Sequence, residues 1–176
     1  MRAAGRLMKF DTYFRACSYA MIGGGVLALA LAGGVGPALA LAFAAVLAVS
    51  WRLEATRWQL SPRAGTYVVL AALPVFYLDW RWQAGAPGLA GQMLAGVAAL
   101  AHFTLILSSI KLFQVKADRD WLFLYLISFF QVLLAAGLSL SPVFLASLGL
   151  YVFCALLAFV WFELRRGGGA APPGGG

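Results

Sequence analysis

The fold of this chain is decided by the stretch Lys111–Phe144, KLFQVKADRDWLFLYLISFFQVLLAAGLSLSPVF. Its charged residues gather in a short hinge, with one apolar run before it at residues 92–110 and another after it at residues 121–140. An apolar run of about 20 residues is long enough to cross the hydrocarbon core of a bilayer as a helix. The stretch therefore predicts two membrane helices joined by a short basic loop.

The whole chain has the composition of a membrane protein. Of its 176 residues, 63% are apolar and 11% are charged, and the apolar residues form long blocks rather than an amphipathic pattern. Runs of about 18 or more residues without charge are typical of membrane spans. The formal net charge is +7, but the basic residues are scattered between the apolar blocks instead of gathered on one face. We therefore expect contact with membrane lipids and no nucleic-acid partner.

Six predicted spans alternate with polar or Gly/Pro-rich connections. They form an all-α transmembrane bundle within residues 16–163, with spans at residues 16–34, 37–53, 64–78, 89–110, 121–138 and 142–162. The glycines and proline of residues 33–37 predict a tight turn between the first two spans. Residues 1–15 are basic and partly amphipathic, which suits the inner membrane surface, and residues 164–176 predict a disordered Gly/Pro tail or linker.

The distribution of charge predicts the orientation. With six spans and a cytoplasmic N-terminus, both termini are cytoplasmic, and twelve of the thirteen basic residues fall on that side. Only Arg81 then lies outside, as the positive-inside rule favours. The six tryptophans all fall at predicted span edges, where amphipathic rings prefer the membrane interface. The sequence thus predicts a multi-pass protein of an inner, or plasma, membrane.

The first two predicted spans each carry small residues four positions apart. These residues are Gly24, Ala28 and Ala32 on one span and Ala40, Ala44 and Ala48 on the other. Such spacing lets two helix backbones approach closely, and van der Waals packing favours that approach in lipid. The alternative is that alanine is simply frequent in these spans.

His102, the one histidine, lies near the middle of the fourth predicted span. Ionisable side chains at such depth are costly, which makes each of them a hypothesis of function. No Asp or Glu lies within a predicted span, and the polar groups expected within reach of His102 are those of Gln92, Thr104, Ser108 and Gln131. Ser128 is a further polar candidate. Either His102 is neutral and hydrogen-bonded inside the bundle, or it serves a proton relay or ligand site.

Two groups of charged residues lie at predicted span ends. In one, Lys111 ends the fourth span while Arg119 and Asp120 precede the fifth, and these charges complement the helix dipoles. The alternative is a docking surface for another domain. In the other, Asp79, Trp80 and Arg81 begin the outer loop, as an interfacial anchor or as an ion pair at the mouth of the bundle.

The sequence offers no set of residues suited to catalysis, to a cofactor or to a metal ion. Cys17 and Cys154 fall in different predicted spans and lack the close spacing of a metal or redox pair. The glycine groups lack the strand, turn and helix context of a phosphate-binding loop. We find no paired acids and no Ser/His/Asp set, so we expect the chain not to be an enzyme.

A series of short motifs runs through the second half of the chain. It consists of Lys111-Leu112, Arg119-Asp120, Leu126-Ile127-Ser128-Phe129-Phe130 and Leu138-Ser139-Leu140-Ser141-Pro142. At these intervals the sequence resembles the N-terminal membrane domain of TgpA-type bacterial transglutaminase-like proteins, mainly over residues 90–162. The first three spans agree with that family in number and in the basic loop at residues 52–63.

The resemblance implies a bacterial inner-membrane bundle, one more crossing, an extracytoplasmic transglutaminase-like domain with a Cys-His-Asp triad, and a final helix. Neither Cys17 nor Cys154 can be matched to the nucleophile, so no catalytic residue carries over. We therefore expect a fragment or split module that anchors and positions a transglutaminase-like domain absent from this chain. The alternative is a small transporter or channel with a polar path lined by His102 and Gln131. The sequence leaves the oligomeric state open.

Overall fold

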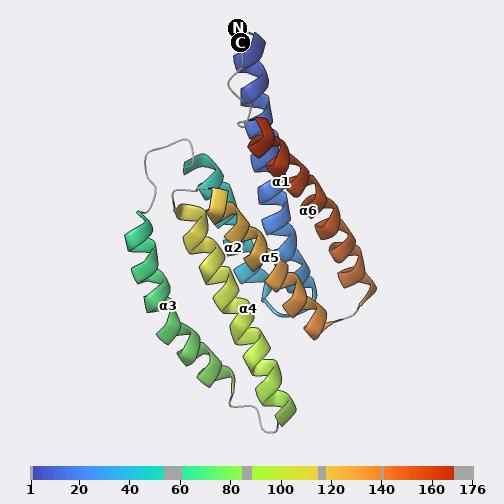
Figure 1. Ribbon diagram of the computed structural model, residues 1–176. Coiled ribbons are helices and arrows are strands. Elements are labelled where there is room, and N and C mark those ends of the chain that lie inside the picture. Colours follow the sequence, from blue (N-terminus) through green and yellow to red (C-terminus); the bar gives the residue numbers. More distant parts are fainter. Residues whose placement is uncertain (1, 54–60, 85–88, 115–117, 140, 169–176) are drawn as a thin grey trace.

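The fold is a bundle of α-helices (Figure 1). The computed structural model describes residues 2–53, 61–84, 89–114, 118–139 and 141–168. Within them the helices are α1 (Arg2–Leu31), α2 (Pro37–Leu53), α3 (Pro62–Gln83), α4 (Leu89–Phe113), α5 (Asp118–Leu138) and α6 (Pro142–Gly168). The predicted all-α fold is therefore confirmed. Successive helices alternate in direction, so α1 begins and α6 ends at one end of the bundle, the terminal end; the other is the distal end (Figure 1).

Four of the described helices are long and apolar enough to cross a membrane, judged by length and composition. Their apolar ranges are Thr12–Leu31, Gly91–Phe113, Arg119–Leu138 and Pro142–Leu164. α2 is apolar throughout but only 17 residues long. α3 is not among the four, since Arg63, Asp79 and Arg81 lower the hydropathy of its 22 residues.

Several helices continue past the ends of the predicted spans. α2 has the predicted range, whereas α3 extends beyond residue 78 to Gln83. α1 is unbroken from Arg2 to Leu31, so the N-terminal segment predicted to be separate continues the first helix. α6 reaches Gly168, inside the predicted tail, and residues 169–176 lie outside the described residues. A helix satisfies its own backbone groups, so it need not end with its last apolar residue.

The turn between α1 and α2 uses the glycines that predicted it. Gly33 adopts a positive φ of 81°, and its N–H donates to the carbonyl of Ala30 at 3.1 Å. The N–H of Gly34 donates to the carbonyl of Leu29 at 3.0 Å. This pair of bonds is the Schellman motif, in which a left-handed glycine ends a helix, and Pro37 then begins the next one.

α1 is the helix on which one half of the bundle is packed. Its most extensive contacts are with α6 and α5. A Cβ atom at Gly24 would lie 3.6 Å from the Tyr151 ring on α6, and one at Gly25 would lie 2.7 Å from Oγ of Ser128 on α5. The small-residue contact predicted between the first two spans is not formed, since Ala44 and Ala48 of α2 are exposed. Spacing identifies a face of small residues but not the helix that covers it.

Aromatic rings join α1, α5 and α6 in the terminal half. The ring of Phe14 lies edge-on to Trp121, with centroids 5.2 Å apart, and 6.2 Å from that of Phe162. Trp121 is only 3% exposed. It is thus a core residue and not the interfacial anchor that its place at a span edge predicted.

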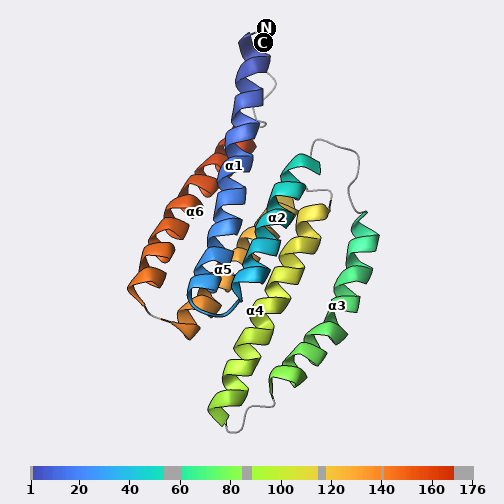
Figure 2. The ribbon, with the colours of Figure 1, turned by 180° about the vertical axis from the view of Figure 1, so that it is seen from behind.

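The other half of the bundle is packed on α4. This helix contacts α3, α5 and α2, whereas α3 has its extensive contacts with α4 alone. Figures 1 and 2 show α3 and α6 on opposite flanks, with α3 bent along its length. Pro74 lies inside α3, where it has no N–H to donate to the preceding turn, and this accounts for the bend.

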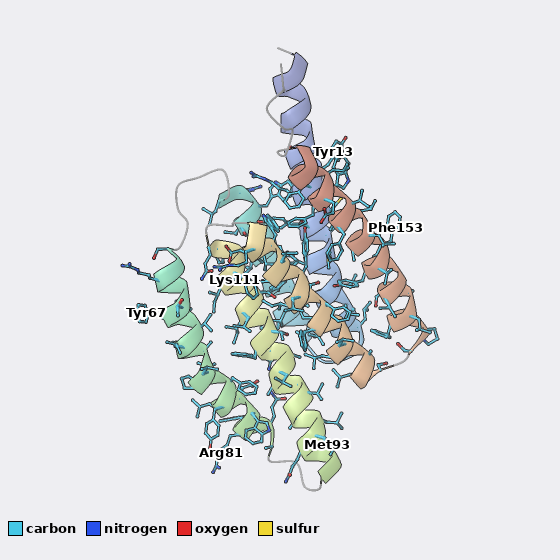
Figure 3. All side chains as sticks on the ribbon, viewed as in Figure 1. Tyr13, Tyr67, Arg81, Met93, Lys111 and Phe153 are labelled. Carbon is cyan, nitrogen blue, oxygen red and sulfur yellow. The ribbon has the colours of Figure 1, made fainter. Side chains whose placement is uncertain are left out.

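Apolar side chains cover the bundle and also fill most of its interior, in which several polar side chains are buried. The most deeply buried polar residues are Ser18, Ser50, Ser108, Ser128 and Gln131, while large apolar side chains project outward from the helices (Figure 3). So many exposed apolar side chains are not expected in water and suit a hydrocarbon solvent. The described residues therefore have the surface of a membrane protein.

The close approach at Gly25 predicts that Gly25→Ala destabilises the bundle. The new Cβ would lie 2.7 Å from Oγ and 2.9 Å from the backbone oxygen of Ser128, so α1 and α5 must separate. Overpacking of this kind costs ~1–3 kcal/mol. Thermal unfolding in detergent should therefore begin at a lower temperature. A Cβ at Gly137 meets nothing within 4 Å, so Gly137→Ala is the control and should not lower the midpoint. Equal midpoints for both variants would contradict the close packing of α1 on α5.

Candidate functional site

An Asp–His pair links α3 to α4. Nδ1 of His102 lies 2.9 Å from Oδ2 of Asp79, and each side chain is about one-third exposed, at 32% and 31%. The same Oδ2 accepts a hydrogen bond from Nε2 of Gln83, one turn further along α3, at 2.9 Å. A carboxylate can only accept, so Nδ1 of His102 carries the hydrogen of this bond. That leaves Nε2 as an acceptor on neutral His102, or a donor on the cation.

The partner of His102 differs from those predicted. Gln92 is exposed, Thr104 donates to the carbonyl of Ala101 on its own helix, and Ser108 is bonded to Gln131. The third predicted span ends at residue 78, which places Asp79 in a loop. Because α3 continues to Gln83, Asp79 instead faces α4. The available signal was the spacing of Asp79 and Gln83, which suits an i to i+4 hydrogen bond on a helix.

The pair lies in an apolar groove of about 560 Å³. Its walls come from α2 and α3 and its floor from α4; the lining residues are Leu39, Ala42, Phe43, Val46, Val75, Phe76, Asp79, Ala99, His102, Phe103, Leu105, Ile106 and Ser109. Ser109 donates to the carbonyl of Leu105 at 2.8 Å. The described residues place no hydrogen-bond partner on Oδ1 of Asp79 or Nε2 of His102. Both atoms therefore remain available to a ligand.

The other two polar candidates, Gln131 and Ser128, lie elsewhere in the bundle. Nε2 of Gln131 donates to Oγ of Ser108 at 3.2 Å, and Oγ of Ser128 donates to the carbonyl of Met21 at 3.1 Å. All of these side chains are fully buried, and none of them lines the groove that contains His102. His102 and Gln131 thus do not share a site, and this arrangement gives no support to a common polar path.

An ion pair between two of the charged residues crosses the hinge. Nζ of Lys111, in the last turn of α4, lies 2.9 Å from Oδ1 of Asp120, in the first turn of α5. The same ammonium lies 5.6 Å from the centroid of the Phe123 ring, a cation–π distance. Arg119 is exposed. Lys111 at the end of α4 and Asp120 at the start of α5 are compatible with the predicted complementation of the helix dipoles, and their ion pair also joins the two helix ends. Arg119 remains at the surface.

Asp79, Trp80 and Arg81 do not act as one cluster. Asp79 turns toward α4, and its partners among the described residues are His102 and Gln83 rather than Arg81. Trp80 and Arg81 are exposed, and Figure 3 shows Arg81 near the distal end of α3, beyond the ends of α5 and α6. The three residues thus divide between the groove and the distal surface.

Within the part of the chain that the structure describes, no group of three His, Cys, Asp or Glu side chains is placed to hold a metal ion.

The position of the Asp79–His102 bond predicts that Asp79→Ala loosens α3 specifically. α3 has its extensive contacts with α4 alone. Losing this partly exposed bond should therefore lower the free energy of local opening of α3 by ~1 kcal/mol, which raises the opening equilibrium constant about fivefold. Hydrogen–deuterium exchange of α3 amides in detergent measures the effect. Asp120→Ala, which removes the Lys111 pair, is the control and should leave α3 exchange unchanged. Unaltered α3 exchange in Asp79→Ala would show that the bond does not hold the helix.

The chain matches the family described as the TgpA N-terminal domain over residues 19–176. No curated protein and no solved structure matches the chain. The family match takes in the C-terminal part of α1, from residue 19 on, and all of α2 to α6, and it agrees with the resemblance at residues 111–142. The chain therefore belongs to the TgpA N-terminal domain family.

Proposed function

We propose that this chain is the integral membrane module of a TgpA-like protein and that it anchors and positions a transglutaminase-like domain at the outer face of the bacterial inner membrane. The domain is carried on the same polypeptide or encoded separately. The observation that carries this proposal is the family match over residues 19–176, on helices with the length and composition of membrane spans. The TgpA N-terminal domain is not itself catalytic, so the module acts by placement.

The proposed topology has six crossings and both termini in the cytoplasm. Among the described basic side chains, Arg81 belongs to the distal end, while the remaining ones belong to the terminal half: Arg15, Arg52, Arg63, Lys111 and Arg119. Figure 3 illustrates this separation for Lys111 and Arg81. Basic residues are retained on the cytoplasmic side. This charge distribution supports a cytoplasmic terminal end and an outer distal end.

The hairpin of α3 and α4 supplies a surface for the positioned domain. In Figures 1 and 2 its distal end projects beyond the turn between α1 and α2 and beyond the facing ends of α5 and α6. Trp80 and Trp82 are 43% and 89% exposed there. Exposed tryptophan beside arginine is a composition enriched at protein contacts. The tip of the hairpin is therefore the surface that we assign to domain contact.

The proposed orientation predicts opposite labelling of two engineered cysteines. In a background of Cys17→Ala and Cys154→Ala, Trp82→Cys should react with a membrane-impermeant maleimide added to intact spheroplasts. Arg119→Cys, exposed at the start of α5, should react only after the membrane is opened. The reverse pattern would overturn the orientation, and release of the protein by alkaline carbonate would overturn the membrane location itself.

The proposed contact predicts a site-specific crosslink in cells. A photoreactive benzoylphenylalanine in place of Trp82 should yield a crosslinked peptide from a transglutaminase-like domain, identified by mass spectrometry. The control places the same probe at Leu156, a 61% exposed position on α6, where lipid contact is expected. If the domain is captured from position 156 and not from position 82, the α3–α4 surface is the wrong one. Capture from neither position, with correct topology, would contradict the anchoring role.

A further inference from the structure

The groove beside α3 has the polarity of a site for an amphiphile. On α3 and α4 its most distal lining residues are Asp79 and Ala99, with His102 one turn along, whereas Ser109 lies toward the terminal end. Since Ser109 is bonded to its own helix, the free polar atoms of the groove gather at its distal end. The rest of the lining is apolar. A bound molecule would therefore place its polar group distally and its hydrocarbon toward the middle of the bundle.

The size and openness of the groove favour a lipid over a helix. Its volume of about 560 Å³ falls in the ~300–1,000 Å³ range of small-molecule sites. A helix is ~10–12 Å across with its side chains, which is large for such a space. Two wall residues, Leu39 and Val75, are 42% and 51% exposed, so the groove communicates with the surrounding apolar phase. A bilayer lipid can therefore enter sideways without passing through the bundle.

The negative charge of Asp79, at the distal end of the groove, favours one kind of lipid headgroup. Oδ1 of Asp79 accepts no hydrogen bond from the described residues, and a carboxylate accepts strongly from a charged N–H donor. A primary ammonium supplies three such donors. A quaternary ammonium has no N–H to offer, and an anionic headgroup would be repelled by the carboxylate. Charge complementarity thus favours a headgroup that ends in a primary ammonium.

We propose that the groove formed by α2, α3 and α4 binds phosphatidylethanolamine, with its ammonium on Asp79 and an acyl chain along the apolar walls. His102 is a positioning residue here, because its bond to Oδ2 orients the carboxylate. The site requires that the chain lie in a bilayer, but it does not require the transglutaminase-like domain. Binding also gives α3, whose extensive contacts are with α4 alone, a further attachment to the bundle.

A second groove in the molecule provides an internal comparison. It has a volume of about 420 Å³ and is lined from α1, α5 and α6 by residues that include Met21, Phe129 and Leu156. None of the described residues that line it is an aspartate or a histidine. We expect hydrocarbon chains to occupy this groove without regard to the headgroup, so headgroup preference reports on the α2–α3–α4 groove.

Native mass spectrometry of the full chain in detergent tests the proposal. Phosphatidylethanolamine, phosphatidylcholine and phosphatidylglycerol with identical acyl chains are titrated separately. The ethanolamine lipid should bind about tenfold more tightly than the other two at one site. Asp79→Asn keeps an acceptor for His102 but removes the charge, so it should abolish the preference. Hydrogen exchange of α3 should stay as in the parent protein, which separates lost recognition from lost structure.

A groove-filling variant gives a test that leaves Asp79 intact. Ala42 is exposed and lines the groove from α2, so Ala42→Trp should remove the high-affinity lipid. Ala44 is also exposed on α2 but lies outside the lining, so Ala44→Trp is the matched control and should bind as the parent does. Equal binding of all three lipids, retention of the preference in Asp79→Asn, or no lipid bound at all would each overturn the proposal. The last outcome would assign the groove to a protein partner, and none of the three outcomes bears on the anchoring role.

Discussion

The structure depends on hydrogen bonds that buried hydroxyl and amide groups make between helices. Ser18 is bonded to Tyr125 at 2.5 Å, which joins α1 to α5, and Ser50 of α2 is bonded both to Tyr19 of α1 and to the carbonyl of Leu112 at the end of α4. In a hydrocarbon solvent no water is present to hydrogen-bond these groups. Because apolar side chains alone give little preference for one neighbour over another in lipid, such bonds and close backbone contacts fix which helices meet.

The existence of the helices and their turns could be predicted from the sequence, because both follow from local chemistry. Long apolar runs cannot satisfy their backbone in lipid except as helices, and Gly33 and Pro37 end one helix and begin the next. Partner choice could not be predicted in the same way. The small residues Gly24, Ala28 and Ala32 of α1 were assigned to a contact with α2, yet Gly24 lies against Tyr151 of α6. Spacing along one helix carries no information about its neighbour.

The Asp79–His102 bond was missed for a related reason. A charged residue after an apolar run is ordinarily taken as the end of a membrane span, and that rule placed Asp79 in solvent. The carboxylate is instead only 31% exposed, since α3 continues for another turn and supplies Gln83 as a second donor. His102 is an ionisable group inside an apolar helix, which is itself a reason to search nearby helix ends for an acid. The partner lay outside the predicted span, one residue past its boundary.

The bundle contains two kinds of polar group, which differ in whether all their hydrogen-bonding atoms have partners. Ser18, Ser50 and Ser128 are fully buried and bonded to other helices, so they specify the packing. Asp79 and His102 are partly exposed, and each has a hydrogen-bonding atom without a partner among the described residues at an apolar groove. A hydrogen bond that only holds helices together in lipid is best buried, because lipid headgroups can compete for a polar atom that is exposed at a groove. The proposed lipid recognition accounts for the cost of an ionisable pair that is bonded on one side and open on the other.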